Sequence, residues 1–280
     1  MSWRNRPERG SFGLKRLIIW LALHAGRPFC RVLLVPISAY FLVTAPRERR
    51  ASREFLTHAL GRRATWRDAF HHLFVFGTTL LDRVFLLHGR HQELEVTVTN
   101  ERVFDEAIAA GRGCLLLGSH LGSFEMLGVI GSVERRLAIN MVMHLEDTAG
   151  LRELLADSNQ DIPYKVIPLG QPESMLRVKE CLDRGEVVGI LADRVYGDEA
   201  TQAVRFLGAP ARFSLSPFRL ARITGAPVVT AFGLYHGARR YEIVFEALGA
   251  PEPAPYVAVL ERQARRAPYN WFNFYDYWGA

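Results

Sequence analysis

Hydrophobic and polar positions follow two different periods from residue 94 onward. Short apolar runs typical of strands occupy residues 94–98, 114–118, 137–143, 165–168, 187–191, 228–234 and 241–245. Apolar residues at helical spacing occupy residues 101–110, 148–158, 173–184, 215–224 and 257–266. This alternation predicts an α/β fold with a mostly parallel central sheet flanked by helices. Residues 206–214 lie between these elements, and we expect them to form an apolar loop.

The N-terminal region has a different pattern, in which apolar stretches are flanked by basic residues. Residues 17–25 and 32–45 are largely apolar, and Gly-Arg-Pro at 26–28 separates them. Neither stretch reaches the roughly 20 residues that a spanning helix needs. We favour two helices lying in a membrane interface over a kinked single span; a buried helical hairpin is the remaining alternative. The chain therefore divides into a helical membrane-associating region, 1–92, and an α/β domain, 93–280.

Residues 65–87 predict a further helix, because apolar side chains recur there at helical spacing. We expect this helix to lie in the core or at an interface. It carries two adjacent histidines, His71 and His72. No second pair of ligands stands at metal-binding spacing, so we expect both histidines at the rim of the helix rather than on a metal.

Composition and charge narrow the possible partners. A hydrophobic content of 49% argues against disorder. Residues 1–67 hold fourteen lysines and arginines against three acids, a net charge of +11, whereas the remainder holds 21 basic and 26 acidic residues, a net charge of −5. A basic, apolar terminus fits an anionic membrane surface, and without a polar basic helix we expect no nucleic acid partner. Three separated cysteines fit buried thiols in a reducing compartment.

The segment 118–125 carries the most informative polar residues. It reads Gly-Ser-His-Leu-Gly-Ser-Phe-Glu and continues the apolar run 114–118. His120 falls at the carboxyl end of that strand, where open α/β sheets bind ligands, and Glu125 falls about one turn into the next helix. A histidine oriented by a carboxylate can act as a general base, and the backbone N–H groups after Gly122 are natural oxyanion donors. The alternative is a helix-capping serine beside a structural histidine.

A second polar group follows another predicted strand. Residues 192–197 read Ala-Asp-Arg-Val-Tyr-Gly directly after the apolar run 187–191. Asp193 and Arg194 therefore lie at the same edge of the sheet as His120. Removing such a charged pair from water is costly unless it has partners. We expect this pair to bind substrate or to organise the site.

Four segments, in this order, resemble a known family. They are His-Leu-Gly-Ser-Phe-Glu at 120–125, Ala-Asp-Arg at 192–194, Phe-Leu-Gly-Ala-Pro-Ala at 206–211 and Thr-Gly-Ala-Pro-Val-Val at 224–229. With the basic, apolar N-terminus they resemble the bacterial lipid A biosynthesis acyltransferases, the lauroyl and myristoyl transferases. These belong to the wider glycerolipid acyltransferases with a His-x4-Asp/Glu motif. The resemblance covers nearly the whole chain.

The resemblance implies an enzyme at the cytoplasmic face of the bacterial inner membrane. Such an enzyme moves a fatty acyl chain from acyl carrier protein or coenzyme A to a hydroxyl group of a lipid acceptor. His120 would be the general base and Glu125 its orienting partner. Ser123, Asp193 and Arg194 are substrate-binding candidates. We expect no cofactor and no metal, because a thioester is already activated, and we favour a monomer.

Two departures from the family pattern concern the acceptor. Family members carry an arginine near residues 157–159, which read Asp-Ser-Asn in this chain. Arg152 lies a turn and a half earlier, and we expect it to bind substrate. The C-terminal residues 268–278 also differ from the Trp-x-His/Arg-Arg ending of the lipid A enzymes. An acceptor other than lipid A, such as an aryl polyene, an amino-acid lipid or another glycolipid, is therefore open.

Two other functions would use the same residues. A thioesterase or lipid esterase with the same His/Glu pair would release free fatty acid without any acceptor. A non-catalytic lipid-binding membrane protein would tolerate the loss of His120. A serine acyl-enzyme through Ser119 or Ser123 is a weaker idea, because the chain has no G-x-S-x-G elbow at this position.

Overall fold

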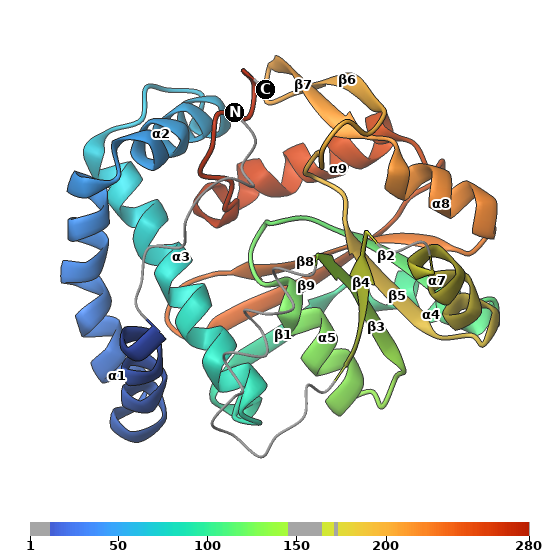
Figure 1. The fold of residues 1–280 in the computed structure, drawn as a ribbon, viewed down its shortest axis with the longest axis horizontal. Coiled ribbons are helices and arrows are strands. Elements are labelled where there is room, and N and C mark those ends of the chain that lie inside the picture. Colours follow the sequence, from blue (N-terminus) through green and yellow to red (C-terminus); the bar gives the residue numbers. More distant parts are fainter. Residues whose placement is uncertain (1–11, 145–163, 171–172, 280) are drawn as a thin grey trace.

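The computed structural model describes residues 12–144, 164–170 and 173–279 of the chain (Figure 1). Its helices are α1 (Phe12–Thr44), α2 (Pro46–Leu60), α3 (Trp66–Leu87), α4 (Glu101–Ala109), α5 (Phe124–Val133), α7 (Ser174–Asp183), α8 (Ser216–Thr224) and α9 (Pro253–Arg266). Its strands are β1 (Glu95–Thr99), β2 (Cys114–Gly118), β3 (Ile139–His144), β4 (Lys165–Leu169), β5 (Val187–Leu191), β6 (Thr201–Phe206), β7 (Ala209–Ser214), β8 (Val228–Tyr235) and β9 (Arg240–Ala247). The helix expected at 148–158 lies outside the described residues.

One seven-stranded sheet forms the centre, in the order β1-β9-β8-β2-β5-β3-β4. Its strand pairs are parallel except for β8 and β9, which are antiparallel. The predicted α/β fold with a mostly parallel sheet is confirmed. The order of the strands in the sheet reverses direction at β2. After β2 the chain continues to β3 and β4 on one side, and later adds β5 on that side and β8 on the other side of β2. In open α/β sheets such a point is where ligands bind.

Helices cover both faces of the sheet, and the alternation along β2 explains why. Leu115 and Leu117 point into a core that contains residues of α2, α7, α8 and α9. Cys114 and Leu116 point into a second core with residues of α3, α4 and α5. A strand buried on both faces reads as a continuous apolar run, as this one does. Cys30, Cys114 and Cys181 are all buried free thiols.

The N-terminal helix α1 packs against α3 and is broken where the sequence predicts. Gly26 has φ +80° and ψ 167°, which separates two helical parts within α1. Next to this break the buried Arg27 pairs with Asp82 of α3 at 2.5 Å, and Asp82 accepts a hydrogen bond from Tyr241 of β9 at 2.8 Å. This buried network fixes the kink of α1 to the body of the protein. The boundary between residues 92 and 93 stays a prediction.

In the described part of the chain, two helical stretches have the length and apolarity needed to cross a membrane. They are Ile18–Thr44 and Trp66–Leu87, and the apolar 18-residue window is 17% buried in the first and 61% buried in the second. The second packs against α1, α5 and the C-terminal segment, as expected for a core helix. The first exposes large apolar side chains on its outer side, including Val32, Tyr40 and Val43. The candidate membrane-associating surface therefore lies on α1.

The prediction of an apolar loop at residues 206–214 is wrong, because these residues belong to a β-hairpin. Strands β6 and β7 pair antiparallel, and Leu207 and Gly208 form the turn with φ of +51° and +91°. Positive φ at both central positions is typical of a tight hairpin turn. Phe206 and Phe213 of this hairpin are buried against the C-terminal aromatic residues. Helix α2 was also not expected from the sequence.

A close backbone approach holds the turn after β2. Gly122 has φ +79°, and a Cβ atom there would lie 2.0 Å from the carbonyl oxygen of Gly233 in β8. Its N–H donates to Asn270 O at 2.8 Å, and the next N–H, of Ser123, donates to Gly233 O at 2.8 Å. Only glycine tolerates both the conformation and the contact. The turn that carries His120 is therefore fixed between β8 and the C-terminal segment.

We expect Gly122→Ala to destabilise the protein by about 3 to 4 kcal/mol, because it adds backbone strain and a clash with Gly233. Gly61→Ala is the matched control, since Gly61 has φ +64° but open space around it. It should cost only about 1 kcal/mol. Denaturant unfolding of both variants measures the difference. Equal losses at the two positions would contradict the importance of the close approach.

Candidate active site

The register between β2 and β5 brings two predicted site residues together. These parallel strands pair with Gly118 opposite Leu191, and Ala192 N donates to Gly118 O at 3.0 Å. Two residues further along each strand, His120 stands opposite Asp193. The carboxyl edge of the sheet therefore presents a histidine and an aspartate from two segments 73 positions apart.

His120 is held by Asp193 on two sides. The ring Nδ1 lies 2.8 Å from Asp193 Oδ1, and the backbone N–H of His120 donates to Oδ2 at 3.1 Å. Asp193 is fully buried, whereas 18% of the His120 side chain is exposed. An ionised carboxylate can only accept, so Nδ1 carries the proton and Nε2 of the neutral ring keeps its lone pair. This is the tautomer that a general base needs.

The C-terminal segment 268–278 completes the shell around Asp193. Trp271 Nε1 and Asn273 Nδ2 donate to Asp193 Oδ2 at 3.0 and 2.9 Å, and the Tyr277 hydroxyl donates to the Asp193 carbonyl at 2.7 Å. Burial alone would raise the pKa of Asp193, but the charges of His120 and Arg194 and the hydrogen bonds from His120 and Asn273 lower it to about 2. Asp193 is therefore ionised at neutral pH despite its complete burial.

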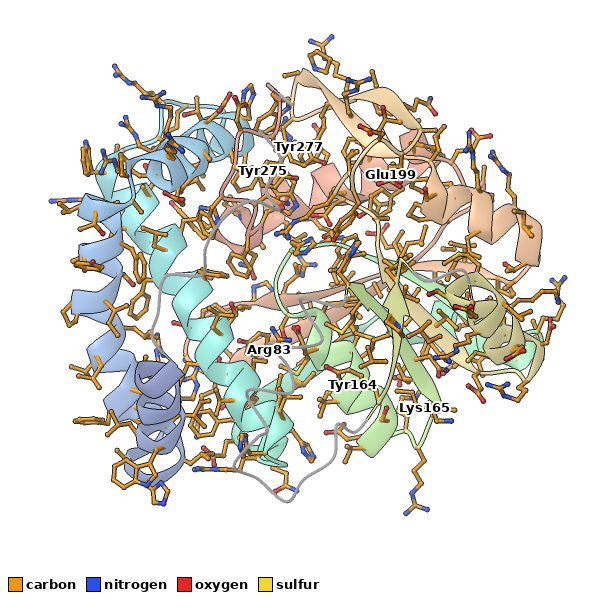
Figure 2. The ribbon with its side chains drawn as sticks, viewed as in Figure 1. Arg83, Tyr164, Lys165, Glu199, Tyr275 and Tyr277 are labelled. Carbon is orange, nitrogen blue, oxygen red and sulfur yellow. The ribbon has the colours of Figure 1, made fainter. Side chains whose placement is uncertain are left out.

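The same segment also contacts the His120 turn and the N-terminal helices. Phe272 N donates to His120 O at 2.8 Å, and His72 Nε2 lies 2.9 Å from Trp271 O. The rim position expected for His72 is wrong, since it is fully buried, with its Nδ1 2.9 Å from Ser52 Oγ. Burial lowers the pKa of His72 to about 3, so it is neutral. In Figure 2 Tyr275 and Tyr277 mark this segment beside α2.

No pattern in the sequence assigns a role to Trp271 or Asn273. Both lie in an aromatic run that differs from the expected family ending. A signal was present, because two asparagines, Asn270 and Asn273, interrupt this run, and an amide among aromatic residues needs buried hydrogen-bond partners. Asn270 bonds both the N–H and the carbonyl of Tyr235, at 2.7 and 3.1 Å. The partners of both amides lie in segments far away along the chain, in β8 for Asn270 and directly after β5 for Asn273, which sequence spacing does not reveal.

Glu125 is not the carboxylate that hydrogen-bonds His120. Its Oε1 lies 3.0 Å from Nη2 of Arg83 in α3, and both side chains are largely buried. Figure 2 shows Arg83 between α3 and α5, with Tyr164 nearby. Burial and the charge of Glu125 raise the pKa of Tyr164. The expected His120–Glu125 pairing is therefore corrected: the helix start directs Glu125 toward α3, and Asp193 takes the orienting position at Nδ1.

The other predicted site residues have different surroundings. Ser123 precedes α5 as its N-cap residue, and its buried hydroxyl has no hydrogen-bond partner in the described part of the chain. Arg194 donates to Asn273 Oδ1 at 2.7 Å and to Phe272 O at 3.1 Å, so it contacts the C-terminal segment. Arg152 lies outside the described residues. Substrate binding by these three residues stays a prediction.

The expected oxyanion donors are partly occupied. The N–H groups of Gly122 and Ser123 already bond to Asn270 and Gly233. The next amides, of Phe124 and later residues, belong to the first turn of α5, whose N–H groups have no partner within the helix. Among the described residues no group of three His, Cys, Asp or Glu side chains could hold a metal ion.

The structure thus combines a mostly parallel α/β sheet with a histidine–aspartate pair at its carboxyl edge. The chain belongs to the bacterial lipid A biosynthesis acyltransferase family, whose sequence profile matches residues 74–250. The family expected from the four segments is thereby confirmed. The chain is also similar to phosphatidylinositol mannoside acyltransferases from two strains of Mycobacterium tuberculosis, each 28% identical over 135 residues. The aligned part is 48% of this chain and only 42% of each relative's length.

We expect Asp193 to make the free energy of unfolding depend on pH in the acidic range. Its folded pKa of about 2 lies below the ordinary 3.8, so its contribution is present above about pH 4 and is lost as the pH falls toward 2. The loss amounts to about 2 kcal/mol. Denaturant unfolding at several pH values should give a shallower acid dependence for Asp193→Asn than for wild type. Parallel curves would contradict this expectation.

The Arg83–Glu125 pair should behave as a unit in a double-mutant cycle. Arg83→Met leaves the largely buried Glu125 charge without its partner, and we expect a loss of about 3 kcal/mol in stability. Glu125→Gln combined with Arg83→Met should restore most of this loss, because neither charge then remains. Chemical unfolding measures the cycle. Additive losses would show that the two side chains do not interact.

Proposed function

We propose that this protein is a membrane-associated acyltransferase that moves a fatty acyl chain from a thioester to a hydroxyl group of a lipid or glycolipid. Family membership supports acyl transfer. The observation that carries the catalytic part is the 2.8 Å contact between His120 Nδ1 and the fully buried, ionised Asp193 at the carboxyl edge of the sheet. Acyl carrier protein or coenzyme A would bring the acyl group.

His120 would act as the general base in a direct transfer. Nε2 takes the proton of the acceptor hydroxyl while its oxygen attacks the thioester carbonyl carbon. The C–S bond then breaks, and the thiolate leaves with the proton that His120 has held. Asp193 stabilises the imidazolium that forms between these two proton transfers. No acyl-enzyme and no metal are needed, because the thioester is already activated.

The start of α5 is suited to stabilise the oxyanion of the tetrahedral intermediate. Its first-turn N–H groups follow directly on the His120 turn, and Ser123 gives them no side-chain cap. Uncapped amides at a helix N-terminus are suitable donors to a developing negative charge. Glu125, neutralised by Arg83, would keep this helix start in place without adding a free negative charge beside the oxyanion.

Helix α1 supports an arrangement on the membrane surface. Its outer side exposes apolar residues, whereas its kink is tied to the protein through the buried Arg27–Asp82 pair. A helix fixed along the side of the protein in this way fits an interfacial position better than a separate span. We propose the cytoplasmic face of the bacterial inner membrane, where acyl thioesters and lipid acceptors meet.

The acceptor would be a membrane lipid with a free hydroxyl group. The relatives from Mycobacterium tuberculosis are acyltransferases of a mannosylated phosphatidylinositol, and their likeness supports a glycolipid acceptor. The C-terminal segment and residues 157–159 differ from the pattern of the lipid A enzymes. We therefore propose a glycolipid other than lipid A as the first acceptor class to test.

We expect His120→Ala to lower the rate of acyl transfer by about 100- to 10,000-fold, because the general base is lost. Asp193→Asn should lower it by about 100-fold or more, because an amide can favour the wrong tautomer of the ring. The assay uses the full chain in detergent, a labelled acyl group on acyl carrier protein or coenzyme A, and total bacterial lipid as acceptor. Arg177→Gln, an exposed change on α7, is the control.

The labelled product separates the alternatives. Label in a lipid that depends on His120 supports the acyltransferase and identifies the acceptor by mass spectrometry. Label released as free fatty acid, with no lipid product, would instead indicate a thioesterase that uses the same histidine and water. The absence of any His120-dependent product from either donor would contradict catalysis and leave a lipid-binding protein.

A further inference from the structure

A basic cleft lies on the outer side of α2, away from the candidate active site. It has a volume of about 630 Å³ and lies between α2, the following loop and the start of α3. Its lining comprises Pro46, Arg49, Arg50, Arg53, Glu54, Thr57, His58, Arg63 and Trp66. Four arginines therefore surround a cleft that contains a single acidic side chain, and the cleft is suited to an anionic ligand.

Two of these arginines are held in place by the protein. Arg53 donates through Nε and Nη2 to Ala64 O at 3.1 and 3.0 Å. Arg49 donates to Leu42 O at 2.5 Å, and its guanidinium lies 4.4 Å from the centre of the Trp66 ring. Fixed guanidinium groups lose little further freedom when a ligand binds. The cleft is thus partly organised before any ligand arrives.

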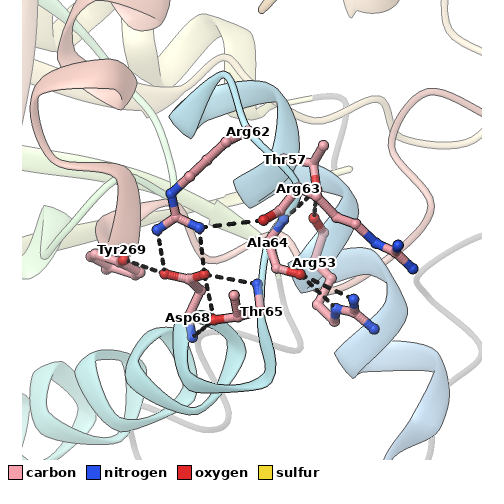
Figure 3. Close-up of polar contacts among 8 residues, drawn as sticks. All are labelled: Arg53, Thr57, Arg62, Arg63, Ala64, Thr65, Asp68 and Tyr269. Carbon is pink, nitrogen blue, oxygen red and sulfur yellow. Dashed lines mark hydrogen bonds and ion pairs between the residues drawn. The ribbon is translucent and has the colours of Figure 1, made fainter.

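The other two arginines remain available. Arg50 and Arg63 are exposed, and neither side chain makes a hydrogen bond or ion pair within residues 12–144, 164–170 and 173–279. In Figure 3 the guanidinium groups of Arg53 and Arg63 extend to the same side of the loop. Arg62 extends to the other side, where it pairs with Asp68 at 2.9 Å. Arg62 is therefore a structural arginine on one side of the loop, whereas Arg53 and Arg63 lie on the side of the cleft.

The position of the cleft indicates which anion it meets. Arg49 bonds the last carbonyl groups of α1, so the cleft begins where the exposed apolar side of α1 ends. Tyr40, Val43 and Trp66 at this end are 62%, 69% and 51% exposed. Tyrosine and tryptophan beside arginine are typical of the boundary between the acyl chains and the head groups of a membrane.

We propose that this cleft binds the phosphate of an anionic phospholipid head group while the apolar side of α1 lies in the same membrane. The inference rests on the membrane association proposed above and adds a defined head-group site to it. An acidic protein such as a carrier protein would also match the charge. The exposed apolar and aromatic rim favours the lipid, because a membrane covers both the rim and the cleft.

A head group in this cleft would fix the membrane surface relative to the candidate active site. Phe55 lies on the inner side of α2, where its ring is 4.8 Å from that of Trp271, and Trp271 donates to Asp193. The cleft is therefore separated from the His120–Asp193 pair by the width of α2 and by the Trp271 side chain. A lipid bound in the cleft would thus hold the membrane surface at a fixed distance from the base.

The test compares two pairs of charge changes in the full chain. Arg50→Gln with Arg63→Gln removes the two arginines of the cleft that are exposed to solvent. Arg47→Gln with Arg67→Gln is the matched control, because these exposed arginines lie at the same end of the protein but do not line the cleft. Flotation measures binding to vesicles of phosphatidylcholine alone or with phosphatidylglycerol, at about 0.1 M salt. Circular dichroism checks that the variants fold.

We expect wild type to bind both vesicles and to prefer those with phosphatidylglycerol. General attraction to an anionic surface contributes up to about fivefold per basic residue. The control pair should lose no more than this, about 25-fold for two residues, in affinity for the phosphatidylglycerol vesicles. The cleft pair should lose clearly more, because direct contacts to a head group are lost as well, and binding to phosphatidylcholine alone should stay unchanged in all variants. These results would support a head-group site.

Other results would overturn the inference. Equal losses in both pairs would show diffuse attraction rather than a site. Unchanged vesicle binding together with lost binding of fluorescent acyl carrier protein in the cleft pair would make the cleft a protein-docking surface. Failure of wild type to bind either vesicle would instead contradict the membrane association itself, so the two proposals fail in different ways.

Discussion

The buried carboxylate of Asp193 is the group on which the site depends. An ionised aspartate without any solvent contact is stable only when donors surround it. Here those donors come from the His120 turn and from the C-terminal segment, through Trp271 and Asn273. One charge therefore joins the ends of β2 and β5 to the last residues of the described chain. The orientation of His120 follows from this arrangement.

The C-terminal segment connects the sheet edge to the N-terminal helices. The Trp271 ring packs against Phe55 of α2, and its carbonyl oxygen accepts a hydrogen bond from Nε2 of His72 in α3. Farther along α3, Asp82 binds Arg27 at the kink of α1. Helix α3 thus links the surface that we assign to the membrane with the candidate active site. The contacts at the two ends of α3, His72 with Trp271 and Asp82 with Arg27, are both polar and buried. Such contacts restrict the relative position of two elements more than apolar packing does.

Individual residues show how far the sequence could be interpreted. The apolar run before His120 and that before Asp193 placed both residues at one sheet edge, and the structure agrees. The sequence nevertheless points to Glu125 as the partner of His120, because Glu125 is only five positions away, whereas the true partner Asp193 is 73 positions away. The hairpin of β6 and β7, residues 201–214, is not predictable for a related reason, since its apolar residues are buried by the distant aromatic residues of the C-terminal segment.

The sequence alone determined the α/β class, the family, the break in α1 at Gly26 and the residues at the sheet edge. These depend on periodicity, on short motifs and on residues with special backbone freedom, all of which are local. Only the tertiary structure decided which carboxylate holds His120 and which arginine neutralises Glu125. Those contacts depend on strand register and on the path of the C-terminal segment. Register follows from the packing of the whole sheet, and no single segment encodes it.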